Sequence, residues 1–263
     1  MTISKNIINI NKSLTSELFN KAIELREKGS GVISFTAGDP YCNLSETIKD
    51  SISKAVNKEC NHYTETIGMF ELRKAISKKI STVDGVRISP RNIVIGNGAK
   101  QCLYNIISVL LNEGDEVLIF NPSWRAYSEI VKLAKGKPKY MDLVPENNYI
   151  IDINEVRKKI NQRTRAIIIN NPNNPTGEII NKNILEKLIE ISMEYNIILI
   201  SDEVYREIIF TNNRFYSLNS LMNEKNKENL VVINSISKSN AMAGWRLGYM
   251  TLPEKLVLLQ KNH

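Results

Sequence analysis

Lys238 lies among small and hydroxyl residues in the segment 235–246, SISKSNAMAGWR, and Arg246 follows it by eight positions. A lysine becomes nucleophilic when its ammonium loses a proton, and a neighbouring cation favours that loss. Ser235 and Arg246 offer hydrogen-bond donors to a phosphate, the arginine as a bidentate fork. The segment therefore favours a lysine that forms a Schiff base beside a phosphate site. Taken alone, a lysine in such a turn is more often a solvated loop residue.

Two further polar groups follow predicted buried strands. The apolar run 196–200 leads to Asp202 and Tyr205, and such a strand delivers polar groups to the sheet edge where α/β proteins bind ligands. A helix-capping aspartate is the plainer interpretation. The strand 165–170 runs into 171–177, NPNNPTG, a rigid loop that could hold Asn174 against a ring or be a simple turn.

A strand near 92–96 is followed by a glycine turn at Gly98 and an apolar helical pattern. The backbone N–H groups of Ala99 and Lys100 would then form a phosphate cradle at a helix N-terminus. The segment matches neither GxGxxG nor a Walker loop, so a dinucleotide or nucleotide site is poorly supported. Trp124 follows the strand 115–120 and could stack on a flat ligand, although such residues are often structural.

Together these motifs describe a planar, phosphorylated ligand with an aldehyde. With the spacing from NPTG through DEVY to SxSKxxxMxGxR, the chain resembles the class I/II aminotransferases, which are fold-type I enzymes that use pyridoxal 5′-phosphate (PLP). The resemblance is closest to their aspartate and aromatic branch, and it covers nearly the whole chain. It implies an α/β fold, the PLP-transferase large domain, in which a mostly parallel sheet has helices on both faces.

The resemblance also implies a role for each matched residue. Lys238 would be the Schiff-base lysine, Asp202 the partner of the ring nitrogen, and Tyr205 and Asn174 the contacts to the ring hydroxyl. Cofactor binding would further involve Gly98, Ala99, Lys100, Trp124, Ser235 and Arg246, with Tyr63 reaching the phosphate of a second subunit in a homodimer. Gly38, Trp124 and Asn174 would line the substrate pocket.

The function implied by the resemblance is transamination between an amino acid and a 2-oxo acid. The resemblance to the aspartate and aromatic branch favours aspartate or glutamate, or an aromatic amino acid, as substrate. A lysine at the position of Lys100 accompanies acidic substrates in the similar branch and favours aspartate or glutamate. Two alternatives stay open: a β-lyase of the same fold, and a non-catalytic or incomplete PLP-binding fragment that needs a second polypeptide. No arginine follows Arg246, whereas the family carries its substrate-carboxylate arginine in a C-terminal small domain. We therefore expect that domain to be largely absent.

The domain organisation expected is an N-terminal arm with the start of the small-domain segment over residues 1–40, and a PLP-binding large domain over 41–263. A helix is predicted over 13–28, a short strand over 31–36 and a helix over 182–195. Further strands are predicted near 196–201, 230–235 and 245–250, which alternate with helices as a parallel sheet requires.

Composition is that of a globular protein, with 42% hydrophobic and 24% charged residues and a net charge of +7. Basic residues are interspersed with acidic ones, so we expect no nucleic-acid partner. Three cysteines without CxxC spacing and two histidines indicate no metal site and a reduced, cytoplasmic setting. No signal peptide or membrane-length apolar run is expected.

Overall fold

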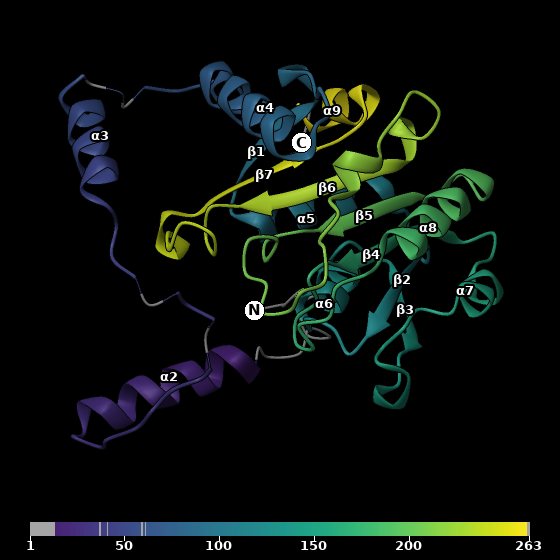
Figure 1. The fold of residues 1–263 in the computed structure, drawn as a ribbon, viewed down its shortest axis with the longest axis horizontal. Helices are drawn as coiled ribbons and strands as arrows, with labels where there is room; N and C mark the ends of the chain where they lie inside the picture. The colour runs from purple at the N-terminus through teal and green to yellow at the C-terminus, as the bar shows by residue number, and fades with distance from the viewer. Residues whose placement is uncertain (1–13, 37, 41, 59, 61, 262–263) are drawn as a thin grey trace, which may run out of the picture.

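A computed structural model describes residues 14–36, 38–40, 42–58, 60 and 62–261. Within this part of the chain, one sheet contains seven strands in the order β1-β7-β6-β5-β4-β2-β3 (Figure 1). The strands are β1 (Ile93–Asn97), β2 (Glu116–Asn121), β3 (Lys137–Asp142), β4 (Thr164–Asn170), β5 (Ile198–Asp202), β6 (Leu230–Ser235) and β7 (Leu247–Thr251). Strands β2 to β6 pair in parallel, and β7 is antiparallel to both β1 and β6. The predicted mostly parallel sheet is confirmed.

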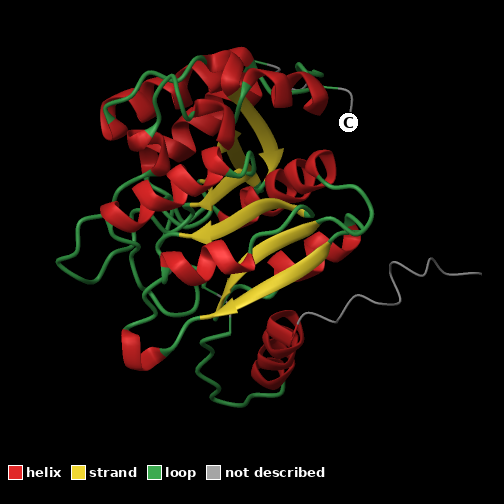
Figure 2. Ribbon diagram, turned by 90° about the vertical axis from the view of Figure 1, so that its right-hand side faces the viewer, coloured by secondary structure: helices red, strands yellow, loops and turns green. Residues whose placement is uncertain are grey.

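Helices cover both faces of the sheet, as the fold prediction requires (Figure 2). One face packs against α5 (Ala99–Leu110), α6 (Ala126–Leu133) and α9 (Glu254–Gln260). The other face packs against α7 (Ile153–Lys159) and α8 (Lys182–Glu194), and α4 (Phe70–Asp84) covers β1 beside Tyr249. Alternate residues of β5 explain this arrangement, since Ile200 faces the first group of helices and Leu199 the second.

The register of the central strands brings polar residues to one edge of the sheet. Asn170 at the end of β4 is aligned with Asp202 at the end of β5, and Asp202 is aligned with Ile233 of β6. Ser235 ends β6 two residues later. Because these strands run in the same direction, their carboxyl ends meet where ligands bind in open α/β sheets.

Helix α5 packs closely on the sheet through Cys102, which is completely buried. A methyl group at Gly96 of β1 would lie only 2.6 Å from the Cys102 sulfur, so a glycine is needed there for this approach. Burial raises the pKa of the Cys102 thiol to about 12. Cys42 and Cys60 are exposed, in contrast.

The N-terminal helices α2 (Leu14–Glu27) and α3 (Glu46–Asn57) stand apart from the sheet and its covering helices (Figure 1). Helix α2 confirms the helix predicted over 13–28, except that Ser13 and the rest of residues 1–13 lie outside the described part. The strand predicted over 31–36 is wrong: no strand forms there, and Ile33 and Phe35 are 81% and 93% exposed. The segment 31–36 pairs with no strand of the sheet, so these apolar side chains stay exposed. The sheet body begins near the buried Ile67, whose carbonyl accepts from the Ile95 amide at 2.9 Å.

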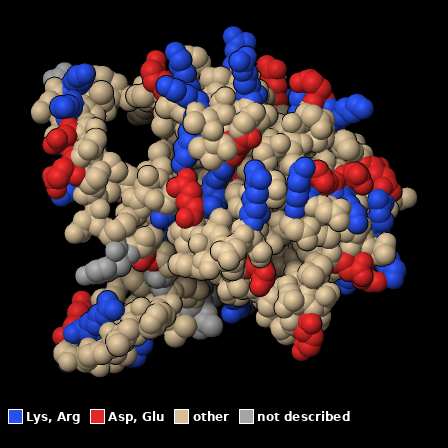
Figure 3. All heavy atoms as spheres, viewed as in Figure 1, with Lys and Arg blue, Asp and Glu red and all other residues tan. Residues whose placement is uncertain are grey.

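Lysine and arginine side chains are mixed with aspartate and glutamate on the face of the molecule seen in Figure 3. This matches the interspersed charge of the sequence. Among the helices of the described residues, none is long and apolar enough to cross a membrane.

Candidate functional site

Asp202 is a buried carboxylate at the carboxyl edge of the central strands, with 4% of its surface exposed. The Tyr127 hydroxyl donates to one carboxylate oxygen at 2.9 Å, and the Val204 amide donates to the other at 3.3 Å. Burial raises the pKa of this carboxyl to about 6, against the lowering effect of both donors. Across the described residues, no lysine, arginine or histidine forms an ion pair with it. A buried carboxylate without a cation favours a ligand that brings a positively charged N–H group.

Tyr205 and Asn174 meet beside this carboxylate. The Asn174 side-chain amide donates to the Tyr205 hydroxyl at 3.3 Å, and its backbone amide donates to the Asn170 side chain at 2.7 Å. Asn170 in turn donates to the Asp202 carbonyl at 2.9 Å. The loop after β4 is thus tied to the end of β5, which holds the two side chains together. A tyrosine hydroxyl and an amide are suited to a ring oxygen.

Lys238 lies in the turn after β6, and its amine is 5.9 Å from the centre of the Tyr205 ring. The Lys238 amine donates to the carbonyl of Gly38, which comes from the N-terminal segment 200 residues away. Burial is the main cause that lowers the pKa of this amine, and the positive charge of Arg246 adds to it, whereas Asp39 opposes it. A lysine whose pKa is lowered toward neutrality is a better nucleophile and base.

Arg246 lies against the N-terminus of α5, where a phosphate cradle is predicted. Gly98 is the residue before α5 and has φ +82°, and a methyl group there would collide with the Arg246 guanidinium. A methyl group at Gly248 would collide with the Ala99 amide nitrogen in the same way. The two glycines therefore let an arginine and the first turn of a helix converge, and Ser235 is buried at the adjoining strand end. Backbone N–H groups and a guanidinium at one place suit an anion.

Trp124 and Lys100 lie side by side at this edge, with the Lys100 amine 5.1 Å from the Trp124 ring centre. The Trp124 ring meets Tyr127 edge to face at 5.4 Å. Tyr127, almost completely buried and hydrogen-bonded to Asp202, is a candidate site residue that the sequence did not predict. Its position three residues after Trp124, in the apolar pattern at the start of α6, is the signal that could have revealed it.

Gly38 and Tyr63 come from the N-terminal part of the chain. Gly38 joins the group through its carbonyl contact with Lys238. Tyr63 does not join it: its side chain is fully exposed, and no hydrogen bond or ring contact ties it to another described residue. The structure thus brings the other predicted residues to one sheet edge and leaves Tyr63 outside.

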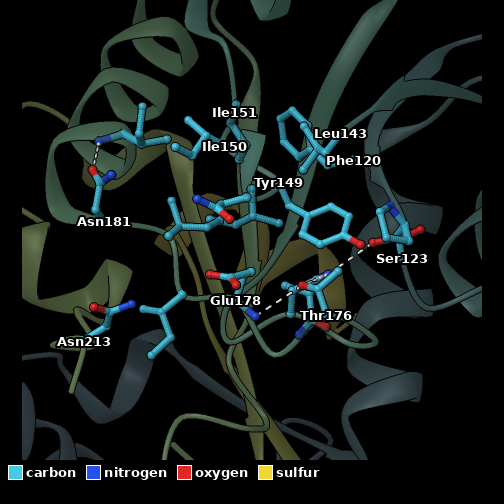
Figure 4. Close-up of a pocket in the computed structure, with 18 of the residues that line it drawn as sticks. Phe120, Ser123, Leu143, Tyr149, Ile150, Ile151, Thr176, Glu178, Asn181 and Asn213 are labelled. Atoms are coloured by element: carbon cyan, nitrogen blue, oxygen red, sulfur yellow. Dashed lines mark hydrogen bonds between the residues drawn. The ribbon is translucent and has the colours of Figure 1, made fainter. Parts of the chain in front are cut away.

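A cavity of about 640 Å³ lies next to this edge but does not contain Lys238, Asp202 or Arg246. It is formed between the loop after β3, the loop after β4 and the start of α8. Figure 4 shows the Tyr149 ring reaching across it toward Ser123 and Thr176. The predicted site is therefore the open sheet edge at Lys238 and not this cavity.

The family model described as aminotransferase class I and II matches residues 30–262 of the chain. The aspartate aminotransferase of Bacillus subtilis (strain 168) is 35% identical over 262 residues, which cover 100% of this chain and 66% of that protein. The aspartate/prephenate aminotransferase of Thermus thermophilus is 31% identical over 255 residues, covering 97% of this chain and 65% of that protein.

Solved structures agree with these matches. The aspartate aminotransferase from Thermus thermophilus with maleate superposes with a TM-score of 0.95 at 30% identity, covering 100% of this chain and 67% of that one. The aspartate aminotransferase from Thermotoga maritima gives a TM-score of 0.93 at 36% identity, covering 99% and 68%. The chain spans slightly less than two thirds of the length of the Bacillus and Thermus proteins that it matches in sequence. It belongs to the class I and II aminotransferase family.

Proposed function

We propose that this chain binds PLP at Lys238 and takes part in transamination between an amino acid and a 2-oxo acid. The observation that carries the proposal is the convergence of a lysine with lowered pKa, a buried carboxylate without a cation and an arginine at a helix N-terminus. Lys238, Asp202 and Arg246 complement the aldehyde, the ring nitrogen and the phosphate of PLP. PLP, when bound, supplies an electron sink for the carbanion formed at the amino acid's α-carbon.

The residues of this chain would divide the work as follows. Arg246, Ser235 and the N–H groups at the start of α5, from Gly98 to Lys100, would bind the phosphate and fix the ring plane. Asp202 would hold the proton on the ring nitrogen, because a buried anion stabilises a neighbouring cation. Tyr205 and Asn174 would donate hydrogen bonds to the ring oxygen, and Trp124 would stack on the ring.

Lys238 would act as nucleophile and then as the group that moves the proton. Its lowered pKa leaves more of the amine uncharged near neutral pH, which both roles require. In the second role the Lys238 amine would remove the α-proton of the amino acid and then deliver it to a carbon atom of the cofactor. Asp202, held by Tyr127, would keep its charge fixed while this occurs.

The substrate and assembly proposals rest on the relatives. We propose aspartate or glutamate, or an aromatic amino acid, as substrate; the matched proteins named aspartate or aspartate/prephenate aminotransferases support aspartate among these. The complete exposure of Tyr63 supports its placement against a second subunit in a homodimer. We further propose residues 41–263 as the cofactor-binding domain and 1–40 as the N-terminal arm with the start of the small-domain segment.

An absorbance titration of the purified chain with PLP tests the proposal. We expect a visible band from the Lys238 linkage that is absent in Lys238→Ala and unchanged in Lys158→Ala, a control whose exposed side chain pairs with Glu155. Loss of the band when aspartate or glutamate is added, with formation of the 2-oxo acid, would identify transamination. Ammonia release would instead indicate a β-lyase.

A band that forms but does not respond to amino acids would identify the second alternative, an incomplete PLP-binding chain. The limited share of the relatives that the chain matches makes this alternative worth the direct comparison. Failure of PLP to form any linkage with Lys238 would contradict the proposal altogether.

A further inference from the structure

The turn that carries Asp202 and Tyr205 has a second, buried polar side. Glu203 lies between these two residues and is completely buried. One of its carboxylate oxygens accepts from the Ser217 hydroxyl at 2.7 Å, and the other accepts from the Leu218 amide at 2.8 Å. The Ser201 hydroxyl adds a third donor at 3.2 Å. Glu203 is therefore held by donors from β5 and from the start of the 3-10 helix Leu218–Leu221.

Arg206 follows on the same buried side. Its guanidinium binds both carboxylate oxygens of Asp84, at the end of α4, with one of the two bonds at 3.2 Å. It also lies 3.6 Å from the Glu203 carboxylate. Only 9% of the Arg206 side chain and 2% of the Asp84 side chain are exposed. The turn is thus connected to a helix 122 residues earlier in the chain.

The cluster extends further to the antiparallel strand β7. The Asn219 amide contacts Asp84 at 3.5 Å, and the Thr251 hydroxyl donates to the Asn219 side-chain oxygen at 2.8 Å. Four segments therefore meet behind the turn: the end of α4, the 3-10 helix Leu218–Leu221, β7 and the turn itself. We name Asp84, Glu203, Arg206 and Ser217 the buried clamp.

Buried ion pairs are weak evidence for stability, because desolvation of the charges offsets most of their attraction. Two carboxylates share one guanidinium here, an arrangement that apolar side chains of similar size could replace without loss of stability. Such a cluster does fix geometry, since a bidentate arginine and several directed hydrogen bonds tolerate little movement. Among the described residues, no hydrogen bond or ion pair joins the clamp to Lys238, and Asp84, Arg206 and Ser217 line a separate cavity of about 510 Å³.

We infer that Glu203 and Arg206 are positioning residues that fix the turn from behind, so that Asp202 and Tyr205 stay aligned with the cofactor. The inference rests on the proposed PLP site. The exposed pair of Lys79 and Glu207, at 2.9 Å, links the same helix α4 to the same turn. It provides a matched comparison, because it ties the two segments together at the surface without the buried network.

The test is a PLP titration of the full chain and four variants: Arg206→Met, Arg206→Lys, Glu203→Gln and the control Lys79→Met. Two quantities are measured, the PLP dissociation constant and the pH midpoint of the visible band of the lysine–cofactor linkage. We expect Arg206→Met to weaken PLP binding about tenfold. It should also raise the pH midpoint, because a displaced Tyr205 hydroxyl no longer stabilises the ring oxygen as an anion. Arg206→Lys should recover part of both effects, and Lys79→Met should match the wild type.

A double variant separates positioning from general destabilisation. If Arg206 acts through Tyr205, the variant Tyr205→Phe/Arg206→Met should have the pH midpoint of Tyr205→Phe alone. A midpoint that moves in Tyr205→Phe but not in Arg206→Met, or two shifts that simply add, would overturn the inference. Should Arg206→Met not fold, Glu203→Gln carries the same test, since it keeps the side-chain size while it removes the charge and one of the two acceptor oxygens.

Failure of this inference differs from failure of the proposed function. A wild-type chain that forms no linkage with PLP contradicts the proposed function and the clamp together. A wild-type chain that binds PLP and responds to Tyr205→Phe, but not to the clamp variants, contradicts the clamp alone.

Discussion

The Tyr127 hydroxyl donates a 2.9 Å hydrogen bond to the Asp202 carboxylate, although the two residues are 75 positions apart in sequence. Both side chains are almost completely buried, at 1% and 4% exposure. Helix α6 therefore reaches across β2 and β4 to orient a charge at the end of β5. An aspartate held in this way cannot turn away from the ligand side without leaving a buried donor unpaired.

Tyr127→Phe should weaken PLP binding by about tenfold, because a hydrogen bond to a charged group is worth about 1.5–3 kcal/mol and its loss lets the carboxylate move. The pKa of Asp202 should rise further, since the lost donor lowers it in the wild type. PLP titration measures the first effect, and the pH dependence of thermal unfolding measures the second. Tyr140→Phe, which alters an exposed tyrosine of β3, is the control and should change neither. Unchanged PLP binding in Tyr127→Phe would contradict the orienting role.

The stability of the ligand-free protein should depend on the protonation of Asp202. Burial raises the pKa of its carboxyl from 3.8 to about 6, so the folded state binds its proton more tightly than the unfolded state. This contribution is fully present below pH 3.8 and is lost as the pH rises through about 6. The loss is on the order of 3 kcal/mol. Urea unfolding at pH 5 and pH 7 of the wild type and Asp202→Asn measures the upper part of this loss, about 1 kcal/mol, because the loss begins near pH 3.8. The wild type should lose more stability than Asp202→Asn; equal losses would contradict the prediction.

Gly98→Ala should disrupt the anion cradle. Its φ of +82° and the close Arg246 guanidinium both oppose a side chain, and we expect a loss of about 1–3 kcal/mol in the free energy of unfolding. Displacement of Arg246 should also weaken PLP binding at least about tenfold. Gly244→Ala is the matched control, because a methyl group there meets no atom within 4 Å. Urea unfolding measures the change in stability, and PLP titration measures the change in binding. Equal stability and equal PLP binding in the two variants would contradict the role of Gly98.

Arg73→Met should release the segment before α4. The buried Arg73 guanidinium donates to the carbonyls of Gly68 and Pro90, at 2.9 and 3.0 Å, and to the Glu65 carboxylate. We expect a loss of about 3 kcal/mol in the free energy of unfolding, because buried acceptors lose their donor. Hydrogen exchange of the amides at 65–69 should become faster. Lys74→Met, one residue further along, should leave that exchange unchanged.

The strands that carry the site could be predicted because they are continuous apolar runs. β5, with every residue buried, follows directly from its sequence. β3 could not be predicted, because Lys137–Asp142 is an edge strand with mostly exposed or half-buried positions and a proline. The strand expected over 31–36 does not form. The pattern of Ile33 and Phe35 is typical of a strand, but it does not show whether a second strand is available to pair with this one.

The site residues with known motifs were identified by their spacing, and the structure brings most of them to one edge. Their buried support could not be identified in the same way. Tyr127 and Arg206 act through partners 75 and 122 residues away, and no local pattern reports such a pairing. The antiparallel direction of β7 could not be predicted either, because hydrophobic periodicity does not distinguish parallel from antiparallel strands.

The packing of Cys102 against Gly96 makes the reactivity of this thiol a measure of how helix α5 moves relative to the sheet. An alkylating reagent needs the thiolate, and a buried thiol with a pKa of about 12 supplies almost none. The exposed Cys42 and Cys60 should react at once, while Cys102 should react only when α5 lifts from β1. Counting alkylated sulfurs by mass over time would therefore measure how often the helix that begins the anion cradle detaches from the sheet.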